Sequence, residues 1–417
     1  MMNYKIADIS LAPSGHKKMS WAWRSMPVLN SLKGQYAAGQ PLKGVKLAAC
    51  LHLEAKTACL LKTSKELGAE VCAAGSNPLS TQDDICAALV ESGVSVFSRH
   101  GMDASEYHQY LKDTLSFGPS VIVDDGADLM ATLFSFMPEL IPAVEGGSEE
   151  TTSGVKRLKA MEREGMIPFP VISVNDANSK YLFDNRYGTG QSVWDGVMRT
   201  TNILIAGKTV VIAGYGWCGR GAAMRAKALG ARVIVTELNP HRAFEAVMDG
   251  NAVMTMAQAA PLGDIFLTFT GNTRVIRGEH FQHMKDGALL GNAGHFDVEI
   301  DKKELKALSV KQEEARPNIE TFTMADGRRL NLLGEGRLVN LACGDGHPIE
   351  IMDLSFALQL ESALYVHQHG RALKSGLMDV PAEIDERVMK VKLSSMGLAL
   401  EELTEEQKAY MNDWRED

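Results

Sequence analysis

Three glycines at fixed spacing, Gly214, Gly216 and Gly219, are the first candidate for chemistry in this sequence. The apolar run Thr209 to Ala213 leads directly into them, and a helix-forming segment follows. In a strand, turn and helix of this kind, the first glycine permits the tight turn and the second lets the backbone approach a pyrophosphate. The third lets the helix pack closely on the strand. We therefore expect a dinucleotide-binding turn, with a purely structural glycine turn as the alternative.

Glu237 ends the next apolar run, Arg232 to Thr236. A carboxylate at this point accepts hydrogen bonds from ribose hydroxyls and repels a 2′-phosphate, so NAD is favoured over NADP. Arg242, five residues further on, weakens the exclusion of NADP.

Polar side chains follow several other apolar runs at the point where each run ends. His52 follows Val45 to Leu51, Asp125 comes shortly after Val121 to Val123, and Lys180 comes shortly after Phe169 to Val174. Because the carboxyl ends of parallel strands meet at one edge of a sheet, these side chains predict a site for a small polar molecule. An aspartate after a strand, such as Asp124 or Asp128, is also a common turn or cap residue. Similarly, Lys180 could be a solvated loop lysine and His295 the cap of a turn.

Strands and helices alternate through the first part of the chain, which predicts a parallel α/β domain with helices on both faces. The glycine unit opens a second α/β domain, with later strands expected at Ile265 to Thr270 and Ala288 to Asn292. Residues Ile351 to Tyr365 predict a long helix, and the charged sequence beyond Pro381 predicts a small helical tail.

Composition limits the function classes. The chain has 417 residues, a net charge of −9 and no basic stripe, so nucleic acid is not an expected partner. No apolar run is long enough to span a bilayer, which argues against a membrane partner. The six cysteines show no CxxC spacing, so we expect free thiols in a cytoplasmic protein without a metal site.

The sequence resembles the S-adenosyl-L-homocysteine hydrolase (adenosylhomocysteinase) family over essentially its whole length. The resemblance rests on motifs in one order: Leu51-His-Leu, Ser80-Thr-Gln-Asp, Asp124-Asp-Gly-Ala-Asp, Ser148-Glu-Glu-Thr-Thr-Ser-Gly, Phe183-Asp-Asn-Arg-Tyr-Gly, Gly214-Tyr-Gly-Trp-Cys-Gly, Gly294-His-Phe-Asp and Glu335-Gly-Arg-Leu-Val-Asn-Leu. It implies a Rossmann-like substrate domain with an inserted NAD-binding Rossmann domain, a small C-terminal helical segment, and homotetramers. The expected bounds are 1–178 and 349–385 for the substrate domain, 190–344 for the NAD domain and 386–417 for the C-terminal oligomerisation segment.

The resemblance also implies a reaction on a nucleoside–homocysteine thioether. NAD oxidises the ribose 3′-hydroxyl, the ketone acidifies the C4′ proton, a base removes it, and the thiol leaves C5′. Water then adds at C5′ and the ketone is reduced, so the net reaction is hydrolysis and NAD is regenerated.

Site residues are carried over from the family at matching positions. Lys180 and Asp184 would act at the 3′-hydroxyl, with Asn185 positioning Lys180. Burial is expected to lower the pKa of Lys180 so that it can take a proton. Asp125 would be the C4′ base, and His52 and His295 would flank C5′. The substrate-binding residues would be Glu54, Lys56, Thr57, Glu150 and His347, with Glu150 on the ribose 2′-hydroxyl. The cofactor-binding residues would be Thr151, Thr152, Ser153, Asn185, Gly214, Gly216, Gly219, Glu237, Arg242, Asn272 and Asn340.

Three features depart from the common family pattern. Where the family reads the purine 6-position with an acceptor, this chain has Lys56, which only donates and suits a 6-oxo group. A family branch with the same Glu-Ala-Lys-Thr pattern is associated with S-inosylhomocysteine; alternatively, Lys56 pairs with Glu54 or Asp83 and the base is read elsewhere. Thr189 replaces a cysteine that is common near the nicotinamide. After Trp414 there is no counterpart of the family's longer tail, whose Lys and Tyr reach a neighbouring subunit, so altered cofactor affinity is expected.

Two rival functions deserve a test. A hydroxy-acid dehydrogenase would accumulate NADH with its substrate, whereas a hydrolase would not. A catalytically silent, NAD-binding regulatory relative would have lost part of the set His52, Asp125, Lys180, Asp184 and His295, and this chain keeps all five.

Overall fold

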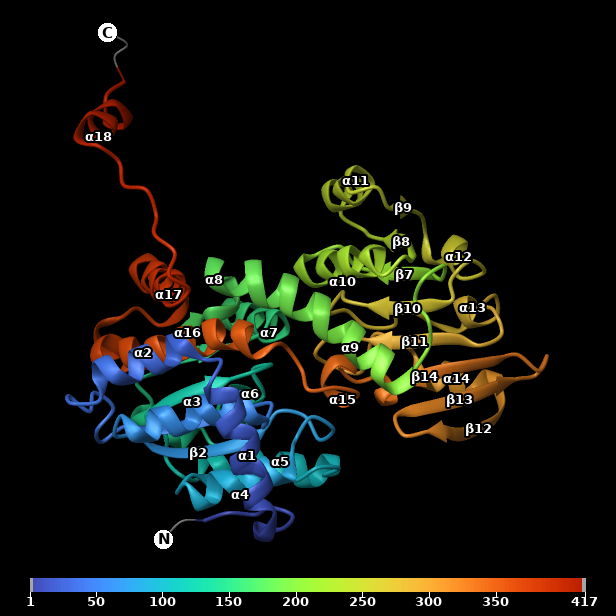
Figure 1. Cartoon of the computed structure of the whole chain (residues 1–417). Helices are drawn as coiled ribbons and strands as arrows, with labels where there is room; N and C mark the ends of the chain where they lie inside the picture. The colour runs from blue at the N-terminus through green and yellow to red at the C-terminus, as the bar shows by residue number, and fades with distance from the viewer. Residues whose placement is uncertain (1–2, 415–417) are drawn as a thin grey trace.

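Two sheets organise the chain, and each is covered by helices (Figure 1). The structure is a computed structural model that describes residues 3–414. The first sheet has seven strands in the order β15-β6-β5-β4-β1-β2-β3, and all neighbouring strands pair in parallel. Its strands are β1 (Lys46–Leu51), β2 (Glu70–Gly75), β3 (Ser95–Phe97), β4 (Val121–Asp124), β5 (Gly146–Glu149), β6 (Pro170–Ser173) and β15 (Gly376–Asp379).

Helices cover both faces of this sheet because its central strands are apolar on both sides. In β1, Leu47, Ala49 and Leu51 pack on one face, whereas Ala48 and Cys50 pack on the other. The first face carries α1 (Ala12–Trp23), α2 (Pro27–Tyr36), α3 (Ala55–Glu66), α4 (Asp83–Glu91), α16 (Ile349–His369) and α17 (Ala382–Ser395). The second carries α5 (Ala104–Leu115), α6 (Asp128–Phe136) and α7 (Thr152–Arg163). The near-continuous apolar run of β1 is what a strand buried on both faces requires.

The second sheet has eight strands in the order β12-β13-β14-β11-β10-β7-β8-β9. Its strands are β7 (Thr209–Ala213), β8 (Arg232–Thr236), β9 (Ala252–Val253), β10 (Ile265–Thr268), β11 (Ala288–Asn292), β12 (Ser309–Arg316), β13 (Ile319–Met324) and β14 (Arg329–Leu333). Its helices are α10 (Trp217–Ala228), α11 (Pro240–Met248), α12 (Met256–Ala259), α13 (Gly278–Phe281) and α14 (Lys302–Leu308). All strands pair in parallel except the antiparallel contacts of β13 with β12 and β14. The fold class predicted from sequence, α/β with Rossmann-like sheets, is confirmed.

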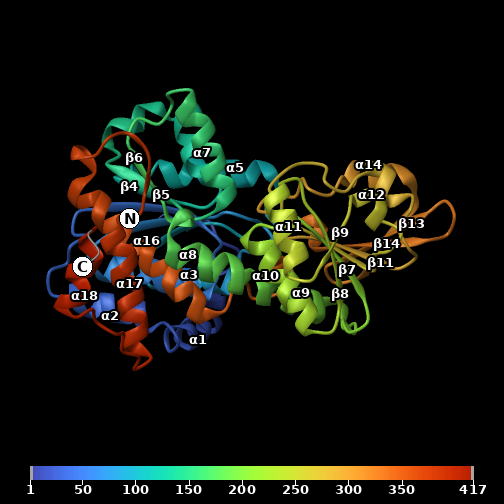
Figure 2. The same ribbon diagram turned by 90° about the horizontal axis from the view of Figure 1, so that it is seen from above.

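The segments that join the two sheets run along the site. The chain leaves the first sheet through the short helix α8 (Asn178–Lys180), a π-helical segment η4 (Tyr181–Gly188) and α9 (Thr189–Thr201). It returns through α15 (Val339–Ala342) and α16, and β15 then pairs in parallel with β6. Figure 2 shows the resulting two lobes, with the second sheet and its helices forming the lobe on the right.

Several strands differ from the sequence-based expectation. β5 and β15 were not predicted, because Gly146-Gly-Ser-Glu and Gly376-Leu-Met-Asp are too short and too poor in β-branched residues to stand out. The β12–β13–β14 meander was also not predicted, since β12 is exposed and largely charged. The strand expected to reach Thr270 ends at Thr268. The helix that follows the first two glycines, α10, begins at Trp217 and therefore includes the third glycine, Gly219.

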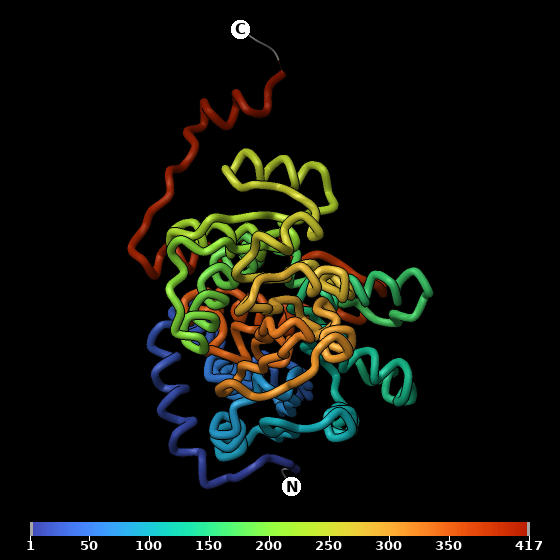
Figure 3. The backbone as a smooth tube through the Cα atoms, turned by 90° about the vertical axis from the view of Figure 1, so that its right-hand side faces the viewer, coloured from blue at the N-terminus to red at the C-terminus, as the bar shows by residue number. Residues whose placement is uncertain are grey.

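The C-terminal part stands away from both lobes. After α17 the chain extends to α18 (Glu405–Asn412), which projects from the body of the molecule (Figure 3). Large apolar side chains along this arm are exposed, among them Leu400, Leu403 and Tyr410. Residues 415–417 of the predicted C-terminal segment lie outside the described residues. Within residues 3–414, no helix combines the length and apolar character needed to cross a bilayer.

Candidate active site

One cavity brings together side chains from both lobes. All the residues predicted to be catalytic or substrate-binding line it: His52, Glu54, Lys56, Thr57, Asp125, Glu150, Lys180, Asp184, Asn185, His295 and His347. Apolar walls come from Leu51, Leu338, Leu341, Met352 and Phe356. A polar site with apolar walls suits a small molecule that carries both a sugar and a base.

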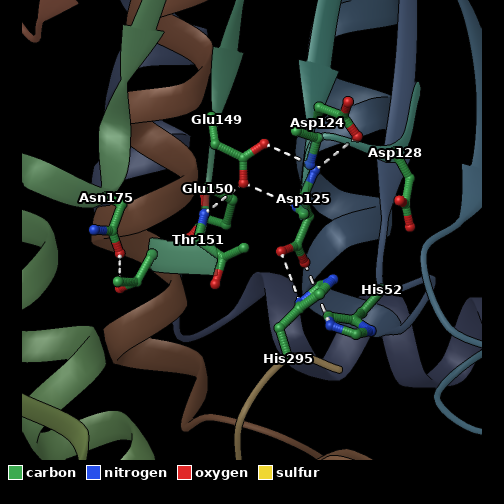
Figure 4. Close-up of polar contacts among 12 residues, drawn as sticks. His52, Asp124, Asp125, Asp128, Glu149, Glu150, Thr151, Asn175 and His295 are labelled. Carbon is green, nitrogen blue, oxygen red and sulfur yellow. Dashed lines mark hydrogen bonds and ion pairs between the residues drawn. The ribbon is translucent and has the colours of Figure 1, made fainter. Parts of the chain in front are cut away.

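Asp125 lies between two histidines (Figure 4). Its Oδ2 is 3.3 Å from Nε2 of His52, and its Oδ1 is 3.5 Å from Nδ1 of His295. His52 is oriented from behind by a 2.7 Å hydrogen bond between its Nδ1 and Oγ of Ser80. Burial lowers the pKa of His52 to about 4, against the opposing pull of Asp125, so this imidazole is neutral at pH 7. The three groups lie within 4.8 Å of one another and could also hold a metal ion; the prediction of no metal site stays a prediction.

Two buried carboxylates hold the loop that carries Asp125 (Figure 4). Glu149, at the end of β5, accepts from the backbone N–H groups of Gly126 at 2.9 Å and Ala127 at 3.0 Å. Asp124 accepts from the N–H of Met130 at 2.8 Å. Burial raises the pKa of Asp124 to about 7 and that of Glu149 well above its usual range. Asp124 therefore has the structural role that the sequence left open.

Lys180 lies between three oxygen acceptors. Its Nζ is 3.0 Å from Oδ1 of Asp184, 3.3 Å from Oε1 of Glu150 and 2.9 Å from Oδ1 of Asn185. Burial pushes the pKa of Lys180 down, but Asp184 and Glu150 outweigh burial and raise that pKa above its ordinary value. The expectation of a lysine with a lowered pKa is wrong for this arrangement, because two carboxylates face the ammonium group.

The segment η4 produces this geometry. A π-helical turn is wider than an α-helical one and is frequent at functional sites. Asp184 and Asn185 lie in it, and both reach back to Lys180 just before it. Asn185 is itself fixed, because its Nδ2 donates to Oδ1 of Asn175 at 3.1 Å.

The carboxylates around Lys180 have further partners: His347, which was a predicted site residue, and Ser355 and Gln359, which were not. Asp184 accepts from Oγ of Ser355 at 2.7 Å and is 3.1 Å from Nδ1 of His347. Burial alone would raise the pKa of Asp184, but Lys180 and then His347 and Ser355 hold it well below its usual range. Glu150 accepts from Nε2 of Gln359 at 2.6 Å, and burial raises the pKa of Glu150 to about 7.

At another part of the cavity, Lys56 is almost fully buried and paired. Its Nζ is 2.8 Å from Oε2 of Glu54 and donates to the backbone oxygen of Asp345 at 2.7 Å. Glu54 also caps α3 by accepting from the N–H groups of Lys56 and Thr57. Of the two partners considered for Lys56, Glu54 is the one observed; Asp83 instead accepts from the N–H of His100.

The glycine turn fits a pyrophosphate. A Cβ on Gly219 would lie 1.9 Å from the carbonyl oxygen of Gly214, so the helix and the turn are in close contact there. A Cβ on Gly216 would have only Nη1 of Arg242 near it, at 3.9 Å, so the turn is open on the side where α10 begins. No side chain caps that helix, which leaves its first N–H groups for a phosphate.

Glu237 lies at the end of β8 beside this turn and accepts from the N–H groups of Tyr215 at 2.7 Å and Asn239 at 2.9 Å. Burial opposes ionisation of Glu237, but these backbone donors keep its pKa below the ordinary value. Its ionised carboxylate has lone pairs left for ribose hydroxyls.

Of the other predicted cofactor residues, some line the cavity and some do not. Thr151, Thr152, Asn185 and Asn340 line the cavity. Oδ1 of Asn340 is buried and has no hydrogen-bond partner within residues 3–414, so it fits a ligand group that donates a hydrogen bond. Ser153 and Asn272 are not among the lining residues, and their cofactor role stays a prediction.

Cys218 was not predicted as a site residue, yet it lines the cavity beside Thr189. Its Sγ is 3.6 Å from Oγ1 of Thr189. A thiol is thus present next to the position where the family commonly has one, although it comes from α10. Burial raises the pKa of Cys218, so the thiol form prevails.

The glycine turn and the cavity together define a dinucleotide-binding protein with an adjoining site for a polar small molecule. Comparison with known proteins makes this class specific. The sequence model described as "S-adenosyl-L-homocysteine hydrolase" matches residues 3–138, and the model of the NAD-binding domain of that hydrolase matches residues 185–346. The chain belongs to the S-adenosyl-L-homocysteine hydrolase family, and NAD is its cofactor.

Full-length relatives carry two different names. The adenosylhomocysteinase of Thermococcus kodakarensis is 58% identical, over 99% of this chain and 98% of that protein. The adenosylhomocysteinase of Pyrococcus abyssi is 55% identical over the same shares. The S-inosyl-L-homocysteine hydrolase of Methanopyrus kandleri is 54% identical, again over 99% of this chain and 98% of that protein.

Proposed function

We propose that this protein hydrolyses the thioether of an S-nucleosyl-L-homocysteine, releasing homocysteine and a purine nucleoside in a reversible reaction. The observation that carries the proposal is the joining of two groups of side chains in one cavity. Lys180, Asp184 and Glu150 form one group, and Asp125 with two histidines forms the other. The first group suits ribose hydroxyls and the second suits proton transfer at carbon and sulfur.

NAD, held at the glycine turn by Gly214, Gly216, Gly219 and Glu237 and in the cavity by Thr151, Thr152 and Asn340, would supply hydride acceptance and return at the ribose 3′-carbon. The ketone stage makes the neighbouring C4′–H acidic enough for a carboxylate to remove. The remaining steps are proton transfers by side chains of this chain.

Lys180 and Asp184 would act at the 3′-hydroxyl. In the structure both carboxylates beside Lys180 hold its proton in place. A ribose that binds Glu150 through its 2′-hydroxyl and Asp184 through its 3′-hydroxyl competes for those oxygens, which lowers the pKa of Lys180. Lys180 then releases its proton to solvent as the nucleoside binds, and the neutral amine can take the 3′-hydroxyl proton.

Asp125 would take the C4′ proton, and the two histidines would serve C5′. His52 is neutral at pH 7 and faces Asp125 through Nε2, so it can exchange a proton with a leaving thiol or an attacking water. His295 supports Asp125 from the other lobe. The loop held by Glu149 and Asp124 keeps the base in place.

Lys56 favours a purine with a 6-oxo group, and inosine is therefore the nucleoside we propose first. An ammonium group has three N–H donors. Lys56 donates one to Glu54 and one to the backbone oxygen of Asp345. The third N–H group can only donate a hydrogen bond, so it suits the 6-oxo group of hypoxanthine and opposes the 6-amino group of adenine. The alternative, adenosine, rests on the pairing with Glu54, which can hold Lys56 away from the base.

The chain architecture supports further parts of the proposal. We propose a substrate domain of residues 1–178 and 349–385, an NAD domain of 190–344 and an assembly segment of 386–417, because the two sheets separate along these lines. The exposed apolar arm supports a homotetramer. All six cysteines are free, which supports a reducing, cytoplasmic location.

Parallel product analysis tests the proposal. The protein as purified is given S-adenosylhomocysteine and S-inosylhomocysteine separately, with no added cofactor, and homocysteine and nucleoside are quantified. We expect both products from at least one thioether. Formation of neither product by a folded, NAD-loaded protein would contradict the function.

A further inference from the structure

Two polar side chains on α16 meet the two carboxylates that flank Lys180. Ser355 and Gln359 are four residues apart, so they lie on the same side of the helix, and both are fully buried. Oγ of Ser355 donates to Oδ2 of Asp184 at 2.7 Å, and Nε2 of Gln359 donates to Oε2 of Glu150 at 2.6 Å.

The opposite oxygens of the same carboxylates face Lys180. Oδ1 of Asp184 is 3.0 Å from its Nζ, and Oε1 of Glu150 is 3.3 Å from it. Each carboxylate is therefore held by α16 through one oxygen and turned to Lys180 through the other. Among residues 3–414, Oε1 of Glu150 has no hydrogen-bond partner apart from its ion pair with Lys180, and Glu150 lines the cavity, so this oxygen is the one that can accept from a ligand.

The amide of Gln359 can present only its NH₂ group to Glu150. Its Oε1 accepts from Oγ of Ser148 at 2.6 Å, and its NH₂ group faces the ionised carboxylate of Glu150, which can only accept. A donor on a carboxylate stabilises the ionised form, so Gln359 keeps the pKa of Glu150 lower than burial alone would leave it.

We propose that Ser355 and Gln359 are positioning residues of the ribose end of the site, which aim Asp184 and Glu150 at Lys180 and at the ribose hydroxyls and set the pH range over which the nucleoside binds. This inference rests on the proposed function. Other charged or titratable groups also face this cluster: Asp125 from the loop after β4, Cys218 from α10 and His347 from the loop before α16. None of these three touches Ser355 or Gln359 through a hydrogen bond in the described residues.

The two residues have distinguishable effects. The pKa of Glu150 is about 7, so loss of its ionised form weakens nucleoside binding as the pH falls through neutrality. We call the pH at which half of the Glu150 carboxylate is ionised the midpoint of nucleoside binding. Without the Gln359 donor this midpoint moves to higher pH by about one unit, which is the effect of losing one charge-assisted hydrogen bond. The pKa of Asp184 is held well below its usual range, so loss of Ser355 leaves the midpoint in place and weakens binding roughly 3- to 10-fold at every pH.

The test measures the dissociation constants of inosine and adenosine by calorimetry across neutral pH, on the protein as purified with its cofactor. Gln359→Leu should move the midpoint up, Ser355→Ala should lower affinity without moving it, and Ser148→Ala should move it up by less. Ser362→Ala is the matched control, because Ser362 is buried on the same helix and its hydroxyl has no hydrogen-bond partner. It should bind as the unaltered protein does.

The outcomes separate the inference from the function. If the unaltered protein binds neither nucleoside, the proposed function fails and this inference fails with it. If it binds a nucleoside but Gln359→Leu keeps the original midpoint, the inference alone is overturned. Should Gln359→Leu not fold by circular dichroism, an unshifted midpoint in Ser148→Ala overturns it equally.

Discussion

At the scale of single residues, we propose that one group of side chains serves the ribose hydroxyls and a second serves C4′ and C5′. Lys180, Asp184 and Glu150 make the first group, and Asp125 with His52 and His295 makes the second. The two groups would act at different stages of one reaction, so variants in each should stop it at different points.

Removing the first group should stop the oxidation. With Lys180→Ala no group takes the 3′-hydroxyl proton, and with Asp184→Ala the 3′-hydroxyl is no longer held beside Lys180. In both variants nucleoside should no longer reduce the bound cofactor, and we expect a loss of about 10²- to 10⁴-fold. Asp125→Asn should still reduce the cofactor but should exchange the C4′ proton with deuterated solvent slowly. Cofactor absorbance and proton NMR of the nucleoside measure the two steps. Rapid C4′ exchange in Asp125→Asn would remove Asp125 from the base role.

The choice of purine base is a prediction about a single residue, Lys56. If Lys56 donates to the 6-position, inosine should be used more efficiently than adenosine in the synthetic direction, and Lys56→Gln should narrow the preference because an amide donates and accepts. A misplaced donor costs about 1–3 kcal/mol, or roughly 5- to 150-fold in discrimination. Competition kinetics with both nucleosides measure it, with Lys62→Gln on the exposed side of α3 as control. An unchanged ratio in Lys56→Gln would show that Lys56 does not read the base.

Most of the site could be predicted from sequence at this scale, for a physical reason. Candidate catalytic side chains such as His52 and Asp125 follow buried strands, and the ends of such strands are recognisable in the sequence. Ser355 and Gln359 could not be predicted in the same way, because they lie inside a long buried helix whose register against the sheet is a tertiary property. The raised pKa of Lys180 likewise depends on two carboxylates brought in by other elements.

At the scale of elements, the loop after β4 is shaped to receive a histidine from the other lobe. Gly126 has a φ of +99°, and a Cβ there would lie 2.3 Å from Nε2 of His295. The glycine therefore leaves room for His295 beside Asp125.

Strands could be predicted from the sequence where an apolar run is bounded by turn residues, as in β4 and β7. A strand made largely of glycine and serine, as in β5, could not be predicted in this way.

Gly126→Ala should displace His295 and reduce homocysteine release at least about 10-fold, with a destabilisation of roughly 1–3 kcal/mol from backbone strain. The control is Gly101→Ala, which has a φ of +70° but no atom within 4 Å of the added Cβ. It carries similar strain without the clash. Activity assays and thermal unfolding of both variants make the comparison. Equal activity in the two would mean that the space beside His295 does not matter.

At the scale of the whole molecule, the exposed arm is the segment that we propose for assembly. Leu400 is 65% exposed and Leu403 is 48% exposed, on a segment that touches little of its own chain (Figure 3). Apolar side chains clustered on one exposed segment are typical of a surface that is buried by a partner. The sequence predicted a tail for assembly from its charge and position, but the direction in which it projects depends on the fold.

The double variant Leu400→Lys with Leu403→Lys should therefore reduce the molecular mass in solution below that of a tetramer, because charged side chains are costly to bury. Sedimentation velocity measures it, with Glu402→Lys on the same segment as the control. A tetramer that survives the double variant would assign assembly to other surfaces, and a monomeric unaltered protein would contradict the proposed homotetramer.

The two lobes join an oxidoreductase site to a hydrolytic one, so the cofactor should be restored in every turnover. The most direct test of this restoration is to follow homocysteine and reduced cofactor together during steady turnover of S-inosylhomocysteine or S-adenosylhomocysteine by the protein as purified. We predict many equivalents of homocysteine per bound NAD, with no net build-up of NADH. One NADH formed for each substrate consumed would contradict the account and would identify an ordinary dehydrogenase.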